Sequence, residues 1–333
     1  MRGGRTLGIA AGLVAGAAFG TGVLWTILTQ AGPPLDAPVT ITVTEGRRFA
    51  DVARELADTG LLRHPLPLVA WARLTGHDRG VHWGEYLITT PLSPLELLAR
   101  LSGPPDPLHM VTIPEGLTVR EIVALLAQAG FGTEESFQCL LDDPSFLASE
   151  ELPAEGAEGY LFPDTYAFPL ATPQDRILRA MLRRFREVFA PDLALRAHRI
   201  GLGEHRAVTL ASLVEEEAKR PEERRLVAAV FLNRLHRGMP LQSDPTVLYG
   251  RDGGGRAITR ADLHRPTPYN TYVIPGLPPT PIACPGRAAL EAAVDPAPVD
   301  YLYFVARGDG SHEFSTTLAQ HNAAVARYQR RGR

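Results

Sequence analysis

The chain of 333 residues has 45% hydrophobic and 21% charged residues, which is ordinary for a protein with a buried core. Its net charge is only −3, so the chain lacks the basic excess expected of a protein that binds nucleic acid. The roughly 300 residues that follow an apolar N-terminal stretch are enough for about two domains.

The two cysteines, Cys139 and Cys284, lie far apart, and neither belongs to a CxxC motif or a cluster with histidine. This pattern gives no support to a zinc site, and we expect neither a metal nor another cofactor. Two unpaired buried thiols are the prediction. A disulfide between them is the alternative, because the compartment predicted below permits one.

The first predicted element is apolar. Residues 7–29 are mostly Leu, Ala, Val, Ile and Gly, with no ionisable side chain, and about 20 such residues cross the hydrocarbon core of a bilayer. We expect a transmembrane helix at residues 7–29. Arg2 and Arg5 precede it, which predicts a cytoplasmic tail at residues 1–6 and a body outside the cytoplasm. A cleaved signal peptide is the alternative, although its apolar core is usually shorter, about 7–15 residues.

A pattern repeats within residues 39–135. Alternating residues typical of a strand end in Glu-Gly at residues 41–46 and again at residues 111–116, and an amphipathic helical pattern follows each. Each predicted helix ends near a glycine, Gly60 or Gly130, as a helix C-cap prefers. The block is therefore predicted to form one or two small α/β modules.

Between the two copies, residues 83–88 are predicted to form a strand, and Ser93-Pro94 to begin a helix that runs through Leu101. Proline favours the first turn of a helix. Trp83 and Tyr86 are expected to lie in the core and at the edge of the strand. The alternative is stacking on sugar rings, as aromatic side chains do in modules that bind glycans.

The remaining residues, 136–330, are predicted to form a mixed α/β domain. Its expected elements are helices at residues 137–147, 176–189, 204–219, 222–237, 288–294 and 318–328, a loop or edge strand at 158–166, loops at 240–285, and two strands at 301–305 and 312–315 joined by a hairpin turn at Gly308-Asp-Gly310.

Three consecutive glutamates end the apolar pattern of the helix at residues 204–219. With Val214 at the centre of the apolar face, Glu216 points into solvent, while Glu215 and Glu217 lie at its two borders. Partial desolvation at such a border raises the pKa of a carboxyl group toward the value that a general acid needs. Periodicity does not choose between the two, and a solvated acidic face is the alternative.

Several motifs follow one another at residues 158–322 of the chain. They are Glu158-Gly-Tyr-Leu-Phe-Pro-Asp-Thr-Tyr166, Ala211-Ser-Leu-Val-Glu215-x-Glu217, Val230-Phe-Leu-Asn233-Arg234-Leu, Gly238-Met-x-Leu241-Gln242-Ser-Asp244-Pro245-Thr246, Pro268-Tyr269-Asn270-Thr271-Tyr272, Gly276-Leu-Pro-Pro-x-Pro-Ile282, Tyr301-Leu-Tyr-Phe-Val305 and Phe314-Ser-x-Thr-x-x-x-His321-Asn322. With these motifs in this order, residues 40–330 resemble the endolytic murein transglycosylase (YceG-like) family.

This resemblance implies an α+β protein with an N-terminal transmembrane helix, LysM-like modules at residues 39–135 and a catalytic domain at residues 136–330. It implies an inner-membrane protein whose outer part cuts nascent peptidoglycan strands between N-acetylmuramic acid and N-acetylglucosamine. The product would carry a 1,6-anhydromuramyl end. Glycan strands and the bilayer are the expected partners, with peptidoglycan synthases as further candidates.

The resemblance selects Glu215 as the catalytic acid, which would first donate a proton and then act as base. Gln242, Asp244, Asn270 and Tyr272 lie on loops from which they could bind substrate together with Glu217. The alternative for each loop residue is that it only tethers the loop.

Two rival functions stay open. A muramidase would hydrolyse the same bond with water and would need a second carboxylate, for which Asp244 is the candidate. A glycan-binding scaffold of cell-wall synthesis would have no catalytic activity.

Overall fold

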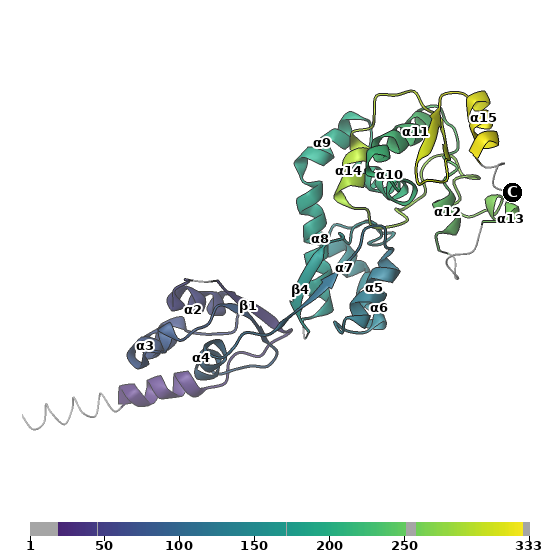
Figure 1. Cartoon of the computed structure of the whole chain (residues 1–333). Helices are drawn as coiled ribbons and strands as arrows, with labels where there is room; N and C mark the ends of the chain where they lie inside the picture. The colour runs from purple at the N-terminus through teal and green to yellow at the C-terminus, as the bar shows by residue number, and fades with distance from the viewer. Residues whose placement is uncertain (1–18, 45, 171, 251–257, 329–333) are drawn as a thin grey trace, which may run out of the picture. The chain divides into compact units, whose positions relative to one another are not determined.

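The computed structural model describes residues 19–44, 46–170, 172–250 and 258–328 (Figure 1). The chain divides into two compact units: residues 1–109 with 167–173, and residues 110–166 with 174–333. The sequence analysis placed the domain boundary at residue 135, whereas the structure assigns residues 110–135 to the second unit. The chain crosses between the units near residue 109 and twice more at residues 167–173.

Only the end of the predicted membrane span can be described, because residues 1–18 lie outside the described residues. Residues 19–29 are helical. Leu28 is buried in the core of the first unit, and the Trp25 ring lies 6.0 Å from that of Trp71. Within the described ranges, no helix is both long and apolar enough to cross a membrane.

The first unit is a two-stranded sheet with helices. Its elements are β1 (Val39–Val43), α2 (Phe49–Asp58), α3 (Pro65–Thr75), the short 3-10 helix η1 (His77–Arg79), β2 (Gly84–Ile88) and α4 (Pro94–Ser102). Strands β1 and β2 are antiparallel, from Val39 opposite Ile88 to Val43 opposite Gly84. The predicted strand at 83–88 and helix after Ser93 are thereby confirmed.

Local sequence explains these elements. The buried side chains of α2 recur at helical spacing, at Phe49, Val52, Ala53 and Leu56. Helix α4 begins with a capping box, in which the Ser93 side chain accepts from the Glu96 backbone N–H and the Glu96 carboxylate accepts from Ser93, so two N–H groups of the first turn are satisfied.

The core prediction is confirmed for Tyr86 and wrong for Trp83. Tyr86 is fully buried, and its hydroxyl donates to backbone carbonyls that include Leu101. The side chain of Trp83 is 67% exposed. It stands just before the first paired residue of β2, Gly84, where the alternation of the strand no longer dictates its side.

The second unit is mostly helical. Strands β3 and β4 are each divided between the two units. The elements are β3 (Leu108–Thr112), α5 (Val119–Gln128), α6 (Glu134–Leu141), α7 (Pro144–Ser149), β4 (Thr165–Pro169), α8 (Gln174–Phe189), α9 (Pro191–Arg199), α10 (Glu204–Glu217), the 3-10 helix η2 (Pro221–Glu223), α11 (Arg224–His236), α12 (Asp244–Leu248), α13 (Arg260–Leu263), α14 (Arg287–Val294), β5 (Tyr303–Ala306), β6 (His312–Ser315) and α15 (Leu318–Tyr328).

Helix α10 lies at the centre of this unit. All of its residues from Ala207 to Val214 are buried, and it packs against α11 and α14, as Figure 1 shows. The alanines Ala289, Ala292 and Ala293 of α14 are buried too, and such small side chains let neighbouring helices approach closely. A helix enclosed on all sides holds the groups at its end firmly.

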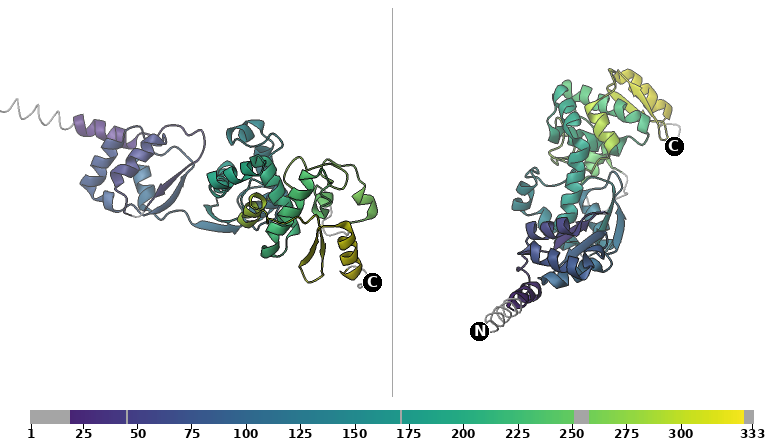
Figure 2. Two further views of the ribbon diagram at one scale, coloured as in Figure 1. Left: turned by 90° about the horizontal axis from the view of Figure 1, so that it is seen from above. Right: turned by 90° about the vertical axis from the view of Figure 1, so that its left-hand side faces the viewer.

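The C-terminal hairpin is confirmed, with β5 antiparallel to β6 from Tyr303 opposite Ser315 to Ala306 opposite His312. Helix α15 packs against both strands, in the yellow part of Figure 2. Sheets β1–β2, β3–β4 and β5–β6 each have two strands among the described residues, which agrees with the predicted α+β class. Both cysteines are free, as predicted, but only Cys284 is buried. The prediction of burial is wrong for Cys139, because it lies on the side of α6 away from the buried Phe137 and Leu141.

Candidate active site

The three glutamates at the end of α10 face different surroundings. Glu215 and Glu217 are partly buried and Glu216 is exposed, which agrees with the helical pattern. Because successive residues of a helix are about 100° apart, Glu215 and Glu217 point to opposite borders of the apolar face.

Glu215 is held by two donors. Its Oε1 lies 3.2 Å from Arg224 Nη2, and its Oε2 accepts the backbone N–H of Gly286 at 3.0 Å. Only 8% of its side chain is exposed. Each oxygen therefore has a partner within the protein, the Arg224 guanidinium for one and the Gly286 N–H for the other.

A second carboxyl group shares this arginine. Arg224 Nη2 lies 3.8 Å from Glu115 Oε2, and the pKa of Glu115 is raised by desolvation and by Glu215. Backbone bonds between the 115–117 and 284–286 segments, Gly116 N–H to the Cys284 carbonyl and Cys284 N–H to the Leu117 carbonyl, bring Glu115 beside Gly286. A Cβ at Gly286 would collide with the Glu115 carboxyl group.

Glu217 has a different environment. Its Oε1 accepts from Ser243 Oγ at 2.7 Å, and it also accepts the backbone N–H of Asp244. Desolvation, and then the carboxylate of Asp244, raise the pKa of Glu217 to about 7 against the opposing influence of Ser243 and His312. A carboxyl group with this pKa keeps a useful protonated fraction near neutral pH, as a general acid requires.

Two other glutamates have a pKa raised to about 7, Glu216 and Glu158, in both cases mainly by desolvation. Glu216 lies beside Gly116, on the side of the 115–117 segment. Glu158 is occupied internally, because it accepts from the Val119 N–H at 3.1 Å and from the Tyr249 hydroxyl at 3.0 Å. Neither is placed with the predicted substrate-binding residues.

The loops that cover Glu217 are joined to each other. The Ser243 N–H donates to Thr271 Oγ1 at 2.9 Å, and the Gln242 N–H donates to the Thr271 carbonyl at 3.1 Å. Gln242 has φ +52°, an uncommon backbone conformation for a residue other than glycine. Its exposed side chain accepts from Arg234 Nη1 at 3.3 Å. These bonds fix Ser243 against Glu217.

Asp244 and Tyr272 form a pair at the same place. The Tyr272 hydroxyl donates to Asp244 Oδ1 at 2.6 Å. Desolvation and Asp244 raise the pKa of the Tyr272 phenol, so it remains a neutral donor. Because the Asp244 side chain is exposed and Tyr272 is partly exposed, polar groups beside Glu217 are accessible to a ligand.

Asn270 has a tethering role instead. It is 1% exposed, its Nδ2 donates to the carbonyls of Asp262, Leu263 and Arg265, and its Oδ1 accepts the Tyr272 N–H. Every polar atom of the side chain is used within the loop. Of the predicted substrate-binding residues, the structure thus brings Gln242, Asp244 and Tyr272 together around Glu217 and leaves Asn270 behind them.

Arg234, which lies in one of the family motifs, organises this region. It is buried, and it donates to the carbonyls of Leu302 and Leu241 at 2.7 and 2.8 Å. Its guanidinium also lies over the Tyr303 ring, 5.2 Å from the centroid. An arginine side chain in a helix is ordinarily exposed to solvent. Only the apolar residues on either side of Arg234 in the sequence indicated that its side chain is buried.

Comparison with known proteins agrees with the motifs. The sequence model of the YceG-like family matches residues 41–327. The endolytic murein transglycosylase of Bacillus subtilis is 31% identical over 310 residues, covering 87% of this chain and 84% of that protein. That of Streptococcus pneumoniae is 30% identical over 332 residues and covers 89% of this chain, which spans 60% of the pneumococcal protein.

A solved structure gives a similar result. The crystal structure of a yceG-like protein from Listeria monocytogenes matches with a TM-score of 0.58 and 27% identity, covering 87% of this chain and 99% of the other.

Proposed function

Because the chain belongs to the YceG-like family, we propose that it is an endolytic lytic transglycosylase, which cuts peptidoglycan strands between N-acetylmuramic acid and N-acetylglucosamine. The observation that carries this proposal is the end of α10, where Glu215 and Glu217 lie partly buried at opposite borders of the helix, with the accessible polar side chains of Asp244 and Tyr272 beside Glu217. The relatives of this chain carry the name endolytic murein transglycosylase.

We assign the acid to Glu215, the first of the two glutamates that periodicity left open and the one that the resemblance selects. Both glutamates have partners within the protein: Arg224 and the Gly286 N–H for Glu215, and Ser243 for Glu217. A proton donor must reach its substrate within hydrogen-bond distance, and contacts made without substrate exclude neither group. Glu217, which has Gln242, Asp244 and Tyr272 around it, is assigned to substrate binding.

One carboxyl group suffices for the reaction. The Glu215 carboxyl donates its proton to the glycosidic oxygen, and the bond from that oxygen to C1 of the muramic sugar breaks. The resulting carboxylate takes the proton of the C6 hydroxyl of the same sugar while the C6 oxygen bonds to C1. Glu215 is thereby protonated again, and no water is consumed. The intramolecular hydroxyl reacts with a high effective concentration.

The accessible groups around Glu217 suit a glycan. The exposed amide of Gln242 and the Asp244–Tyr272 pair offer donors and acceptors for sugar hydroxyl and acetamido groups. Asp244 is also the second carboxylate that a muramidase would need, and its Oδ1 already accepts from the Tyr272 hydroxyl. We therefore place Asp244 in substrate binding and keep hydrolysis as the competing outcome of the test.

The test is the chemistry of the new end. Purified protein is incubated with uncrosslinked glycan strands in heavy-oxygen water, and the products are analysed by mass spectrometry. We expect unlabelled 1,6-anhydromuramyl ends on strands of mixed length. Labelled, hydrated ends would show a muramidase. Disaccharides released from one terminus would refute internal cleavage, and intact strands would favour a scaffold.

We also propose that residues 7–29 anchor the protein in the inner membrane with the body outside the cytoplasm, and that the first unit is a LysM-like module. The order strand, helix, helix, strand of the first unit and the exposed Trp83 support a surface on which a glycan could stack. Peptidoglycan synthases remain candidate partners.

A further inference from the structure

Three segments that are distant in the sequence meet at the carboxyl group of Glu215: residues 115–117, the start of α11 and the start of α14. Gly286 donates its N–H to Glu215 Oε2 at 3.0 Å, and a Cβ on this glycine would overlap the Glu115 carboxyl group. Arg224 Nη2 lies 3.2 Å from Glu215 Oε1 and 3.8 Å from Glu115 Oε2. One guanidinium nitrogen therefore faces two carboxyl groups that lie against the same glycine.

Arg224 makes both contacts through a single nitrogen. Its side chain is 16% exposed, and within the part of the chain that the structure describes its Nε is buried without a hydrogen-bond partner. An arginine that pairs fully with one carboxylate commonly uses two nitrogens in parallel. Neither Glu115 nor Glu215 is paired in that way, so a small rotation of the guanidinium can strengthen one contact at the expense of the other.

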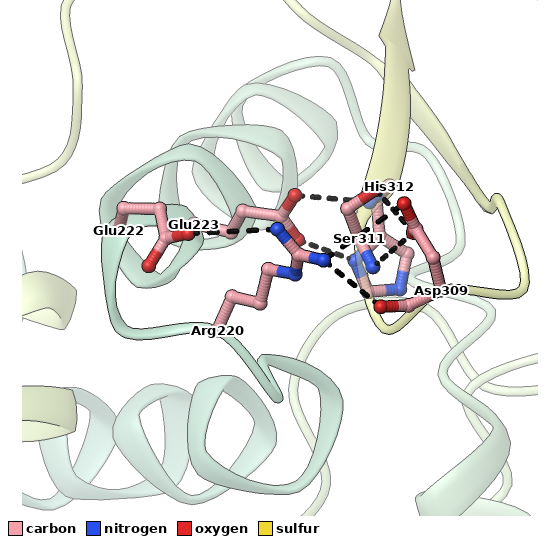
Figure 3. Close-up of polar contacts among 6 residues, drawn as sticks. All are labelled: Arg220, Glu222, Glu223, Asp309, Ser311 and His312. Carbon is pink, nitrogen blue, oxygen red and sulfur yellow. Dashed lines mark hydrogen bonds and ion pairs between the residues drawn. The ribbon is translucent and has the colours of Figure 1, made fainter.

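The backbone that carries Arg224 is fixed by contacts on its other side. Glu223, the preceding residue, accepts from His312 through Oε2 at 2.7 Å from Nδ1 and through Oε1 at 2.9 Å from the backbone nitrogen (Figure 3). Arg220 Nη2 donates to the Asp309 carbonyl at 2.9 Å. The turn before α11 is thereby bound to the hairpin β5–β6 at two points, so any exchange between the two carboxyl groups is left to the Arg224 side chain.

The two carboxyl groups differ in exposure. The side chain of Glu215 is 8% exposed, and that of Glu115 is 48% exposed. A general acid has to be protonated before it can donate its proton. Protonation of Glu215 removes the charge opposite Arg224, and a poorly exposed guanidinium without a counter-charge is costly. Glu115 is placed to supply that counter-charge.

Other titratable groups surround this arginine. Glu216 is the next residue along α10, and desolvation, Glu215 and Glu121 of α5 raise its pKa to about 7. The pKa of Glu115 is raised by desolvation and by Glu215, and Arg224 opposes this rise. Several carboxyl groups therefore compete for one positive charge, which favours a shared guanidinium over a fixed pair.

We propose that Arg224 and Glu115 are positioning residues for Glu215, and that the two carboxyl groups share the guanidinium during the reaction. Arg224 stabilises the carboxylate that Glu215 becomes when it donates its proton. When Glu215 is protonated, Glu115 balances the charge of Arg224. The inference rests on the proposed role of Glu215 as the acid, and it adds a carboxyl group from a segment well before α10 in the sequence.

Urea unfolding tests the sharing without substrate. Glu115→Gln and Glu215→Gln each leave Arg224 one carboxylate partner, whereas the double variant leaves it neither. We therefore expect the double variant to lose more stability than the sum of the two single losses. The excess should become smaller in the Arg224→Met background, which has no charge to balance. Additive losses would overturn the proposal, and so would an excess of the same size in that background, because it would reflect only repulsion between the carboxylates.

The pH dependence of cleavage is the second test, and it serves if Arg224→Met does not fold. In Glu115→Gln the guanidinium has only Glu215 as partner and opposes its protonation, so the alkaline limb of kcat/KM should move down by about one pH unit or more. Glu216→Gln is the matched control, because it removes a neighbouring carboxyl group of α10 but leaves both partners of Arg224, and its limb should move by less. An equal or larger move in Glu216→Gln, or none in Glu115→Gln, would overturn the proposal.

The two tests separate this inference from the proposed function. Unfolding needs no substrate, so it decides whether Arg224 is shared even if the wild-type protein leaves glycan strands intact. In that case the transglycosylase proposal fails by itself. If the wild-type protein forms anhydro ends but the double variant shows additive losses, only the inference about Glu115 and Arg224 fails.

Discussion

Replacing Glu217 by Gln should make the protein more stable at alkaline pH and lower strand cleavage only in part. The folded-state pKa of about 7 exceeds the ordinary value of 4.5. The contribution of Glu217 to stability is therefore fully present below pH 4.5 and is lost as pH rises through 7. Glutamine cannot ionise and can still accept from Ser243, so the variant should escape this loss.

The size of the gain follows from the shift. One pKa unit corresponds to about 1.4 kcal/mol, so the shift from 4.5 to about 7 sets an upper limit near 3.5 kcal/mol at pH 8. At pH 4 the two proteins should differ little, because Glu217 is protonated in the folded state. Glu217 is not the proposed acid, so kcat/KM should fall by less than about tenfold, a smaller loss than removal of an acid causes.

Glu215→Gln is the matched variant, two residues away on the same helix. It weakens charged contacts to Arg224 and Gly286, so we expect it to lower the free energy of unfolding by about 1.5–3 kcal/mol. Its cleavage rate should fall by about 100-fold or more, because the proposed acid is lost.

The assays are urea unfolding at pH 4 and pH 8 and the rate of anhydro-end formation, for both variants. The reasoning fails if Glu217→Gln is the less stable protein at pH 8. It also fails if Glu215→Gln keeps more than about a tenth of the activity while Glu217→Gln keeps less than about a hundredth, the loss expected for an acid. That result would move the acid to Glu217.

Three further predictions concern other parts of the chain. Asp244→Asn removes a negative charge that raises the pKa of Glu217, so a carbon-13 NMR titration of the Glu217 carboxyl should show a lower pKa; a higher pKa would contradict the assigned cause. Asn270→Ala removes the four hydrogen bonds of a buried side chain and should cost about 2–4 kcal/mol in urea unfolding, whereas a loss of activity at unchanged stability would indicate substrate contact. A reporter active only outside the cytoplasm, fused after Arg333, should give signal in the membrane fraction, and a soluble secreted product cut near Ala31 would show a signal peptide.

Periodicity predicted the long helices because their burial repeats every three or four residues. It missed α9 as a separate helix, because α9 begins at Pro191 directly after α8 and its apolar residues continue the helical pattern of α8. It also missed α12 and α13, whose four or five residues are too few to show a period. The predicted helix at 137–147 is two helices because Asp143 caps a new one that starts at Pro144.

Partners distant in the sequence explain the remaining differences. The repeated strand-helix pattern predicted that residues 111–128 belong with the first module, but β3 pairs with β4, about fifty residues later. Likewise, the helical pattern correctly put Glu215 and Glu217 at opposite borders. Which border meets Arg224 and which meets Ser243 depends on loops from elsewhere in the chain, and neither local propensity nor spacing encodes that choice.

The division of the chain has a practical consequence for limited proteolysis and for the design of fragments. The first unit takes residues 167–173 from within the sequence of the second. A cut near residue 109 therefore separates residues 1–109 from the rest of the chain but leaves residues 167–173 of the first unit on the fragment that carries the second unit. A fragment that starts at residue 110 carries seven residues that belong to its absent neighbour. Separate expression would have to replace this segment as well as choose a start, so one nick releases neither unit with all of its own residues.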